Sequence, residues 1–299
     1  MRFAFSTDLA SRPASPMRNL SLAATTLALV TSTFDASAQV KLEANYKVAL
    51  IGVPLGQAAW VIDVDHDRYT VAASAQLGGL IKVFSAGEGA GASKGLLQGG
   101  RLLPQSYAVN IRSKNKVEDV RMTYAGPVVK TISAEPQWDP SPETIPLTEV
   151  HKRGTVDPIS AGLMPPVGNG EFGPEACQRS LTMFDGRMRF DLVLDYKRTE
   201  QSRNAPGYQG PVVVCSVTFK PIAGHEPNRS AIRFLSGSKD IELWLAPIEG
   251  TQFVAMYRIV VPTVLGAATL EATRFAVVGK PPMVPRAANG TKASEAKTP

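Results

Sequence analysis

The stretch Arg187–Tyr196, RMRFDLVLDY, decides the fold class of this chain. Apolar side chains occupy every second position from Met188 to Tyr196, and mostly charged side chains stand between them. A period of two is typical of a strand with one face in the core and the other in water. The same alternation recurs at Trp60–Val64 and at Tyr69–Ala75. These segments indicate antiparallel sheet.

Strand patterns of this kind occupy most of the chain, and no segment has sustained helical periodicity. We expect further strands at 43–51, 105–111, 117–124, 127–133, 211–219, 230–235, 241–246, 252–261 and 267–277. Short polar or Gly/Pro links join them. Because a sheet of this length must curl to protect its edges, the sequence predicts an all-β fold. We expect about a dozen strands in one antiparallel sheet that curls into a barrel, a spiral or a sandwich.

Three segments interrupt the strand pattern. A short helix is expected near 158–164, because Asp157 suits the N-cap and Pro158 suits the first helical position. Irregular chain is expected at Gly87–Gly100, which is rich in glycine and alanine, and at the proline-rich Glu135–Glu149.

The N-terminal segment has the features of a secretory signal peptide. Arg18 supplies a positive charge, Leu20–Val30 an apolar centre, and Ala36-Ser37-Ala38 a small-residue cleavage site. A spanning helix needs about 20 apolar residues, so this run favours a cleaved signal over a retained anchor or a buried core helix. We therefore predict export from the cytoplasm, with no integral membrane span after signal cleavage.

The expected domain organisation has three parts. Residues 1–38 are an upstream extension and the signal peptide, with the start at Met17 and cleavage after Ala38. Residues 39–280 form a single β-rich domain. Residues 281–299 have too few apolar side chains to fold and form a disordered tail.

The charge of the chain is spread out rather than clustered. There are 32 Lys and Arg against 26 Asp and Glu, a formal net charge of +6. Nucleic-acid binding needs grouped Lys and Arg, and the richest basic stretch, Arg112–Lys116, falls where a hairpin turn is expected. We therefore expect no nucleic-acid partner.

The chain has two cysteines, Cys177 and Cys215. In an exported protein, two cysteines most simply form one disulfide. The loop that this bridge closes would contribute roughly 3–4 kcal/mol on the chain-entropy model. A catalytic thiol or a metal pair lacks support, since neither cysteine has a histidine beside it and no CxxC spacing is present.

Six motifs together resemble a family of exported bacterial proteins, the domain of unknown function 3108 (DUF3108). They are Tyr46–Gly56 (YKVALIGVPLG), Gly79–Ser85 (GLIKVFS), Val156–Ala161 (VDPISA), Phe184–Phe190 (FDGRMRF), Ile241–Leu245 (IELWL) and Val264–Gly266 (VLG). The resemblance spans roughly residues 43–277 and rests on the order of the motifs. It implies a β-rich, curled or half-open barrel-like fold in the periplasm, and it implies no agreed activity.

Two aspartates are candidate acid/base groups, but structural roles explain both. The pair Asp185-Gly186 is typical of a type I′ hairpin turn. Asp157 suits a helix N-cap. We therefore predict turn and cap roles for Asp157, Asp185 and Gly186, and no catalytic residue.

The remaining polar patterns are weak. His66, His151 and His225 lie in expected loops, and no nucleophile elbow or HExxH helix accompanies them. Alternating Asp63, Asp65 and Asp67 lack the glycine and distal glutamate of a Ca²⁺-binding EF-hand loop, so a solvated turn is preferred. The glycine-rich Gly87–Gly95 does not match a phosphate-binding loop and is interpreted as a flexible link. We expect no metal and no cofactor.

Aromatic side chains on alternating strands suggest a ligand surface. In a small barrel such residues ordinarily occupy the core. A curled sheet could instead direct them to a concave interior that holds an acyl chain or another amphipathic ligand. The candidate ligand-binding residues are Tyr46, Trp60, Phe84, Trp244 and Tyr257, and Phe190 belongs to the same aromatic set.

These observations favour a non-catalytic periplasmic protein that acts as a binding or structural factor for the cell envelope. We expect a monomer, whose partner would be an envelope lipid, glycan or protein. The alternative is a periplasmic hydrolase of envelope glycan or lipid that uses Asp157 or Asp185 with a loop histidine. A subunit of an assembly is a third hypothesis, for which a long unpaired sheet edge would be the sign.

Overall fold

The computed structural model describes residues 39–78, 86–114, 116–167, 171–202 and 205–279. The first half contains seven strands: β1 (Val40–Leu50), β2 (Val53–Asp65), β3 (Arg68–Leu77), β4 (Gly87–Gln98), β5 (Arg101–Ser113), β6 (Lys116–Ala125) and β7 (Val128–Glu135). The second half contains β8 (Leu163–Met164), β9 (Arg179–Phe184), β10 (Arg189–Gln201), β11 (Pro211–Ala223), α1 (Ser230–Gly237), β12 (Glu242–Pro247), β13 (Val254–Thr263) and β14 (Gly266–Val278). Short 3₁₀ helices lie at Glu149–Lys152, Ser160–Gly162 and Pro174–Cys177.

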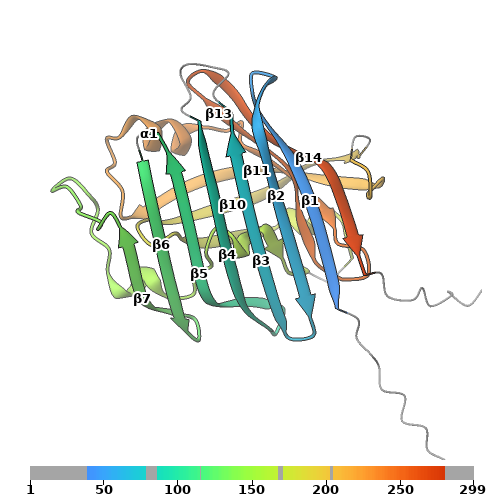
Figure 1. Ribbon diagram of the computed structural model, residues 1–299, viewed down its shortest axis with the longest axis horizontal. Helices are drawn as coiled ribbons and strands as arrows, with labels where there is room; N and C mark the ends of the chain where they lie inside the picture. Colours follow the sequence, from blue (N-terminus) through green and yellow to red (C-terminus); the bar gives the residue numbers. More distant parts are fainter. Residues whose placement is uncertain (1–38, 79–85, 115, 168–170, 203–204, 280–299) are drawn as a thin grey trace, which may run out of the picture. The chain divides into compact units, whose positions relative to one another are not determined.

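The strands form one 14-stranded antiparallel sheet, which confirms the predicted all-β fold. Its order is β7-β6-β5-β4-β3-β2-β1-β14-β13-β12-β11-β10-β9, and β8 pairs with β13 beside this path. Each half of the chain is therefore a meander, and the two meanders join where β1 pairs with β14 (Figure 1). The first and last strands of the domain lie at the middle of the sheet, not at its edges.

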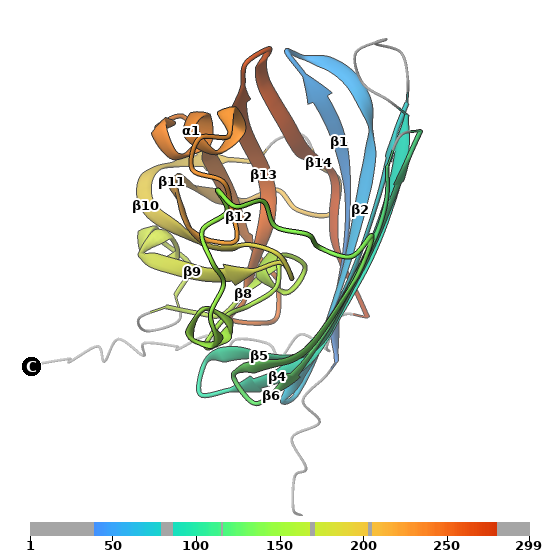
Figure 2. The ribbon, with the colours of Figure 1, turned by 90° about the vertical axis from the view of Figure 1, so that its left-hand side faces the viewer.

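The sheet curls so that its two edge strands approach each other (Figure 2). They do not pair directly; residues 153–156 bridge the gap between them. The amide of Gly154 donates to Pro127 O beside β7 (2.7 Å), and the amide of Val156 donates to Thr182 O in β9 (2.8 Å). The sheet is thus barrel-like but not closed.

The chain after this bridge crosses the interior of the curled sheet. Leu163 and Met164 of β8 are buried and pair with β13. Further along, Cys177 is bonded to Cys215 of β11, with the two Cα atoms 5.4 Å apart. We call residues 157–167 and 171–177 the inner segment, and the predicted disulfide anchors it to the wall of the barrel.

The expectation of irregular chain at Gly87–Gly100 is wrong, because most of this segment is β4, paired along its length with β3 and β5. Glycine is required there by close packing rather than by flexibility. A Cβ atom on Gly95 would lie 2.3 Å from Leu103 O and 2.7 Å from the Tyr69 hydroxyl. Small residues in a strand let neighbouring groups approach, which the composition alone does not reveal.

The helix is also displaced from its expected position. Residues 158–164 form only a 3₁₀ turn, since Leu163 and Met164 continue as β8. Among the described residues the α-helix is α1, and it lies where the sequence predicted a strand, at 230–235. Its Ile232 and Leu235, spaced by one helical turn, pack against the core.

Within the described residues, the structure contains no helix that is long and apolar enough to cross a membrane. The expected leader (1–38), the expected tail (281–299) and the motif Gly79–Ser85 lie outside the described residues.

Candidate functional site

An apolar cavity of about 490 Å³ lies on the inner face of the first meander. Most of its wall comes from the face of β1 to β5 that turns toward the interior, and Leu270 of β14 and Ile159 also line it. Five residues of the opposite face border it: Ala59, Ser74, Glu88, Ala90 and Arg112. The inward-facing lining residues are Tyr46, Val48, Ala58, Trp60, Ala73, Ala75, Leu77, Gly87, Gly89, Gly91, Val109, Ile111, Ser113, Ile159 and Leu270.

The cavity exists because β3 and β4 present small residues to the interior. Ala73 and Ala75 of β3 lie beside Gly91 and Gly89 of β4 in register. A Cβ atom on Gly89 would meet its nearest neighbours at 3.6 and 3.7 Å, which is ordinary van der Waals contact. Larger side chains at these positions would occupy the space, as they do in a packed small barrel.

Two of the predicted ligand-binding aromatics, Tyr46 and Trp60, line this cavity. Their rings meet edge to face, with centroids 6.1 Å apart. The Tyr46 hydroxyl donates to Met256 O (2.6 Å), which fixes the ring between β1 and β13. Burial raises the pKa of Tyr46 far above its ordinary value, so the wall carries no charge there.

The other predicted ligand-binding aromatics lie elsewhere. Trp244 is buried between the guanidinium groups of Arg258 and Arg198, whose Cζ atoms are 4.7 and 5.4 Å from its ring centroid. The Tyr257 hydroxyl shares a 2.6 Å hydrogen bond with Ser202 and its ring packs against Phe275. Neither residue lines the cavity, and Phe84 lies outside the described residues.

Asp157 belongs to a buried polar network on the inner segment. One carboxylate oxygen accepts from the amides of Ile159 (3.0 Å) and Ser160 (2.8 Å), which is the geometry of a cap. The other accepts from the hydroxyls of Ser160 (2.6 Å) and Ser93 (2.8 Å). Desolvation raises the pKa of Asp157 despite these hydrogen bonds, and the Tyr69 hydroxyl completes the network at 2.9 Å from Ser160 Oγ.

Asp185 begins the loop between β9 and β10. Its Oδ1 accepts from the amides of Arg187 (2.8 Å) and Met188 (2.7 Å), and desolvation raises its pKa. Gly186 has a φ of 99°, but Asp185 does not have a positive φ. A type I′ turn needs two positive φ angles, so the predicted type is wrong and a four-residue loop stands in its place.

The described histidines do not form hydrogen bonds or ion pairs with Asp157 or Asp185, the two candidate acid/base groups. His66 lies in the β2–β3 turn, 3.6 Å from Asp65, and His151 Nδ1 accepts from the amide of Thr148 (3.1 Å). His225 lies in the chain between β11 and α1. In the part of the chain that the structure describes, no group of three His, Cys, Asp or Glu side chains could hold a metal ion.

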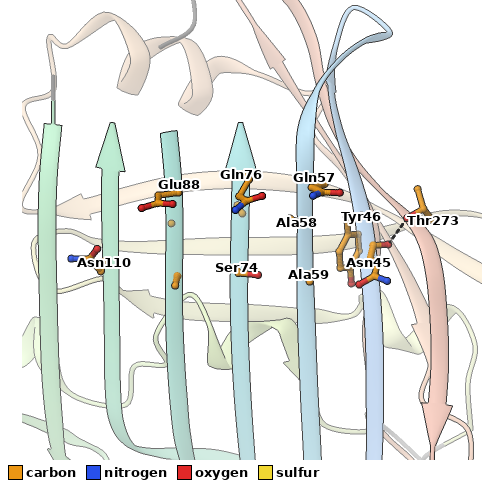
Figure 3. Close-up of a pocket in the computed structure, with 13 residues that line it drawn as sticks. Asn45, Tyr46, Gln57, Ala58, Ala59, Ser74, Gln76, Glu88, Asn110 and Thr273 are labelled. Carbon is orange, nitrogen blue, oxygen red and sulfur yellow. Dashed lines mark hydrogen bonds between the residues drawn. The ribbon is translucent and has the colours of Figure 1, made fainter. Parts of the chain in front are cut away.

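A second hollow, of about 650 Å³, lies across the outer face of the same strands. Figure 3 shows Gln57, Gln76 and Glu88 side by side on β2, β3 and β4, with Asn110 on β5 and Asn45 on β1. These side chains are mostly exposed and exchange hydrogen bonds with water, so a ligand gains little free energy by replacing that water. We therefore take the apolar inner cavity as the candidate site.

Sequence reasoning missed the small residues that create the cavity, Ala58, Ala73, Ala75, Gly89 and Gly91. The available signal was the alternation of glycine with other residues at Gly87–Gly91, which has the period of a strand. Read as composition, this stretch predicted a loop; read as periodicity, it would have predicted a strand with an almost bare inner face.

The fold and cavity define a barrel-like β protein with an apolar interior cavity. The chain belongs to the DUF3108 family, described as a protein of unknown function, whose model matches residues 43–273. No curated protein matches the chain. Among solved structures, it is similar to the crystal structure of a beta-barrel-like protein of domain of unknown function DUF1849 from Brucella abortus. The identity is 7%, the TM-score is 0.43, and the match covers 81% of this chain and 99% of that chain.

Proposed function

We propose that this protein is an exported, non-catalytic factor of the cell envelope that holds the apolar part of an amphipathic ligand in the inner cavity. The observation that carries the proposal is the cavity itself, whose inward-facing wall is made of aliphatic, aromatic and glycine residues, with Ser113 at one end. Transfer of an acyl chain from water into such a wall is favourable in proportion to the apolar area removed from water.

The dimensions of the cavity support a small-molecule ligand. Ligand sites are ordinarily concavities of about 300–1,000 Å³ lined mostly by apolar groups, and this cavity has about 490 Å³. Tyr46 and Trp60 give it a rigid side, since the Tyr46 hydroxyl is already bonded to Met256 O. The segment at Leu20–Val30, with its small-residue cleavage site, supports the periplasmic location.

The hydrolase alternative is less well supported. The carboxylate of Asp157 accepts four hydrogen bonds from its own segment and Ser93, and Asp185 accepts two from its own loop. Both carboxylates therefore have structural partners, and neither lines the cavity. The geometry favours binding over acid/base chemistry.

Quenching of Trp60 fluorescence tests the proposal. Residues 39–299, which contain every helix and strand that the structure describes, are titrated with a brominated fatty acid such as 9,10-dibromostearate. Bromine quenches an indole only at contact, so we expect saturable quenching that the Trp60→Phe variant loses. Trp138 and Trp244 remain in that variant and report any non-specific association.

A matched pair of variants locates the ligand. Gly89→Leu places a side chain in the cavity and should abolish the quenching, whereas Ala92→Leu places the same side chain at an exposed position on the outer face of β4, away from the cavity lining, and should leave it unchanged. Equal binding by both variants, or no saturable quenching of the parent protein, would reject the cavity as the site. Native mass spectrometry of protein purified from the periplasm, followed by solvent extraction, then identifies a co-purifying ligand.

A further inference from the structure

Exposed aliphatic side chains gather at one end of the barrel. Ile51 and Val53 lie at the β1–β2 hairpin and are 65% and 46% exposed. Val264 and Leu265 form the tip of the β13–β14 hairpin and are 83% and 48% exposed. The two hairpins stand side by side and project beyond the neighbouring strands (Figures 1 and 2). We call these four residues the apolar rim.

The opposite ends of the same strands are polar. The β2–β3 turn contains Asp65, His66 and Asp67, all exposed, and the β4–β5 turn runs from Gln98 through two glycines to Arg101. A meander places alternate turns at opposite ends, so this difference separates the two ends of the sheet. Contiguous exposed apolar groups on a protein surface mark an interaction site rather than a random scatter.

The turns do not need apolar side chains for their own geometry. The Thr263 hydroxyl donates to Gly266 O (2.7 Å) and accepts from the amide of Leu265 (3.2 Å), which closes the β13–β14 tip. Ile51 has a φ of 51°, an outlier for a β-branched residue. Asparagine or glycine would adopt this conformation more readily, so the backbone conformation of the turn does not account for an aliphatic side chain there.

The two hairpins form one rigid unit. The amide of Ile51 donates to Ala267 O (2.9 Å). A Cβ atom on Gly266 would lie 2.8 Å from Ile51 Cγ1, so the glycine allows the two tips to pack together. The apolar rim is therefore a fixed surface, not two independent loops.

The cavity reaches this same end of the barrel. Its lining includes Leu77, the last residue of β3, Gly87, the first of β4, and Ser113, the last of β5. The β5–β6 hairpin at this end presents exposed Arg112 and Lys114. Basic side chains at the same end of the sheet as an apolar insertion surface complement anionic lipid headgroups.

We propose that the apolar rim inserts into the surface of a lipid bilayer with anionic headgroups, which places this end of the cavity against the bilayer. This inference rests on the proposed function, because an acyl chain held in the cavity would then pass between protein and bilayer without crossing water. Rim residues enter the headgroup and acyl boundary, and Arg112 and Lys114 lie at the headgroups.

Flotation with lipid vesicles tests the inference. Residues 39–299 are mixed with vesicles of phosphatidylcholine and phosphatidylglycerol in a 3:1 ratio, and the floated fraction is measured. We expect the double variant Val264→Asp/Leu265→Asp to lower the partition coefficient at least about tenfold, because aspartate disfavours the acyl boundary. The matched control, Gln98→Asp/Gln105→Asp, adds the same charge at exposed positions toward the opposite end and should float like the parent.

Two further measurements separate the attraction to anionic headgroups from ligand binding in the cavity. Lys114→Glu should lower flotation with the anionic vesicles and leave it unchanged with pure phosphatidylcholine. Quenching of Trp60 by dibromostearate in solution reports the cavity alone and should be the same in the rim variant and the parent.

Each outcome decides the inference. Loss of flotation in the rim variant with quenching retained supports it. Absence of flotation in the parent, or equal flotation of parent and rim variant, overturns it, and quenching then shows whether ligand binding itself survives. A parent dimer that the rim variant converts to a monomer, without flotation, would assign the rim to a second copy of this chain and also overturn it.

Discussion

Gly162 of the inner segment lies directly against the indole ring of Trp60 in β2. A Cβ atom on Gly162 would be 3.2 Å from both Cη2 and Cζ2 of that ring. Trp60 also meets Tyr46 edge to face and lines the cavity. The inner segment therefore sets the position of the aromatic wall of the cavity.

Gly162→Ala should destabilise the protein and weaken ligand binding. The added methyl group forces the indole ring or the inner segment to move, and overpacking of this kind costs about 1–3 kcal/mol. Urea unfolding gives the loss of stability, and titration with a brominated fatty acid gives the affinity. Gly237→Ala, at the end of α1 where a Cβ would meet nothing within 4 Å, serves as the control and should neither destabilise the protein nor weaken binding.

If Gly162→Ala unfolded with the parent's midpoint and bound the probe equally well, the contact would not position Trp60. The proposed rigidity of the cavity wall would then be wrong.

Removal of the disulfide should loosen the same inner segment. The bond joins residues 38 positions apart, and both cysteines are fully buried. On the chain-entropy model its loss costs roughly 3–4 kcal/mol. Urea unfolding of the Cys177→Ala/Cys215→Ala variant should show this decrease, and the parent in reducing buffer should approach the variant. An unchanged midpoint would mean that packing alone holds the segment in place.

Asp157 should make stability depend on pH. Desolvation raises its pKa in the folded state, whereas the pKa of an unfolded aspartate is about 3.9. The folded state thus keeps the proton to higher pH than the unfolded state. The carboxyl therefore stabilises the folded state most when the pH is below the unfolded pKa, and this stabilisation is lost as the pH rises through the folded pKa. In the Asp157→Asn variant the asparagine cannot ionise, so this contribution to the pH dependence of stability is absent.

Urea unfolding of the parent and Asp157→Asn from pH 4 to pH 8 measures this contribution. The stability of the parent relative to the variant should fall as the pH rises. A difference that stays flat or rises with pH would show that the hydrogen bonds from Ser93, Ser160 and Ile159 outweigh desolvation.

The sequence predicted those parts of the molecule that depend on local pattern. Alternation at Arg187–Tyr196 and Trp60–Val64 correctly placed strands, because one face of each packs on the core. It could not place β4, whose glycines fit because Leu103 O and Tyr69 approach them. Nor could it place α1, since a window of eight residues with Ile232 and Leu235 on one side fits a short strand equally well.

The candidate site was predictable only in part for the same reason. The aromatic character of Tyr46 and Trp60 is visible in the sequence, but Trp244 and Tyr257 have the same character and lie in the core. What separates the two pairs is the residues opposite them. Tyr46 and Trp60 share a space with alanine and glycine of β3 and β4, and Trp244 is covered by two arginines. These relationships are tertiary.

Arg187 connects the two halves of the sheet across the gap that the strands leave open. It forms an ion pair with Glu118 of β6 and donates to Pro136 O after β7 (3.0 Å). Both groups of the pair are largely buried, so their hydrogen bond is charge-assisted and only partly screened by water. The β9–β10 loop is thereby fastened to the far edge of the first meander.

Arg187→Met should therefore open this side of the barrel, at a cost of about 1.5–3 kcal/mol for a hydrogen bond to a charged group. Hydrogen exchange should become faster in β6 and β7 and stay unchanged in β1 and β14, which pair at the centre of the sheet. Lys152→Ala removes an ion pair with exposed Glu149 and should change neither stability nor exchange. Uniformly faster exchange in all strands would instead indicate that the two meanders unfold together and that the gap has no separate opening.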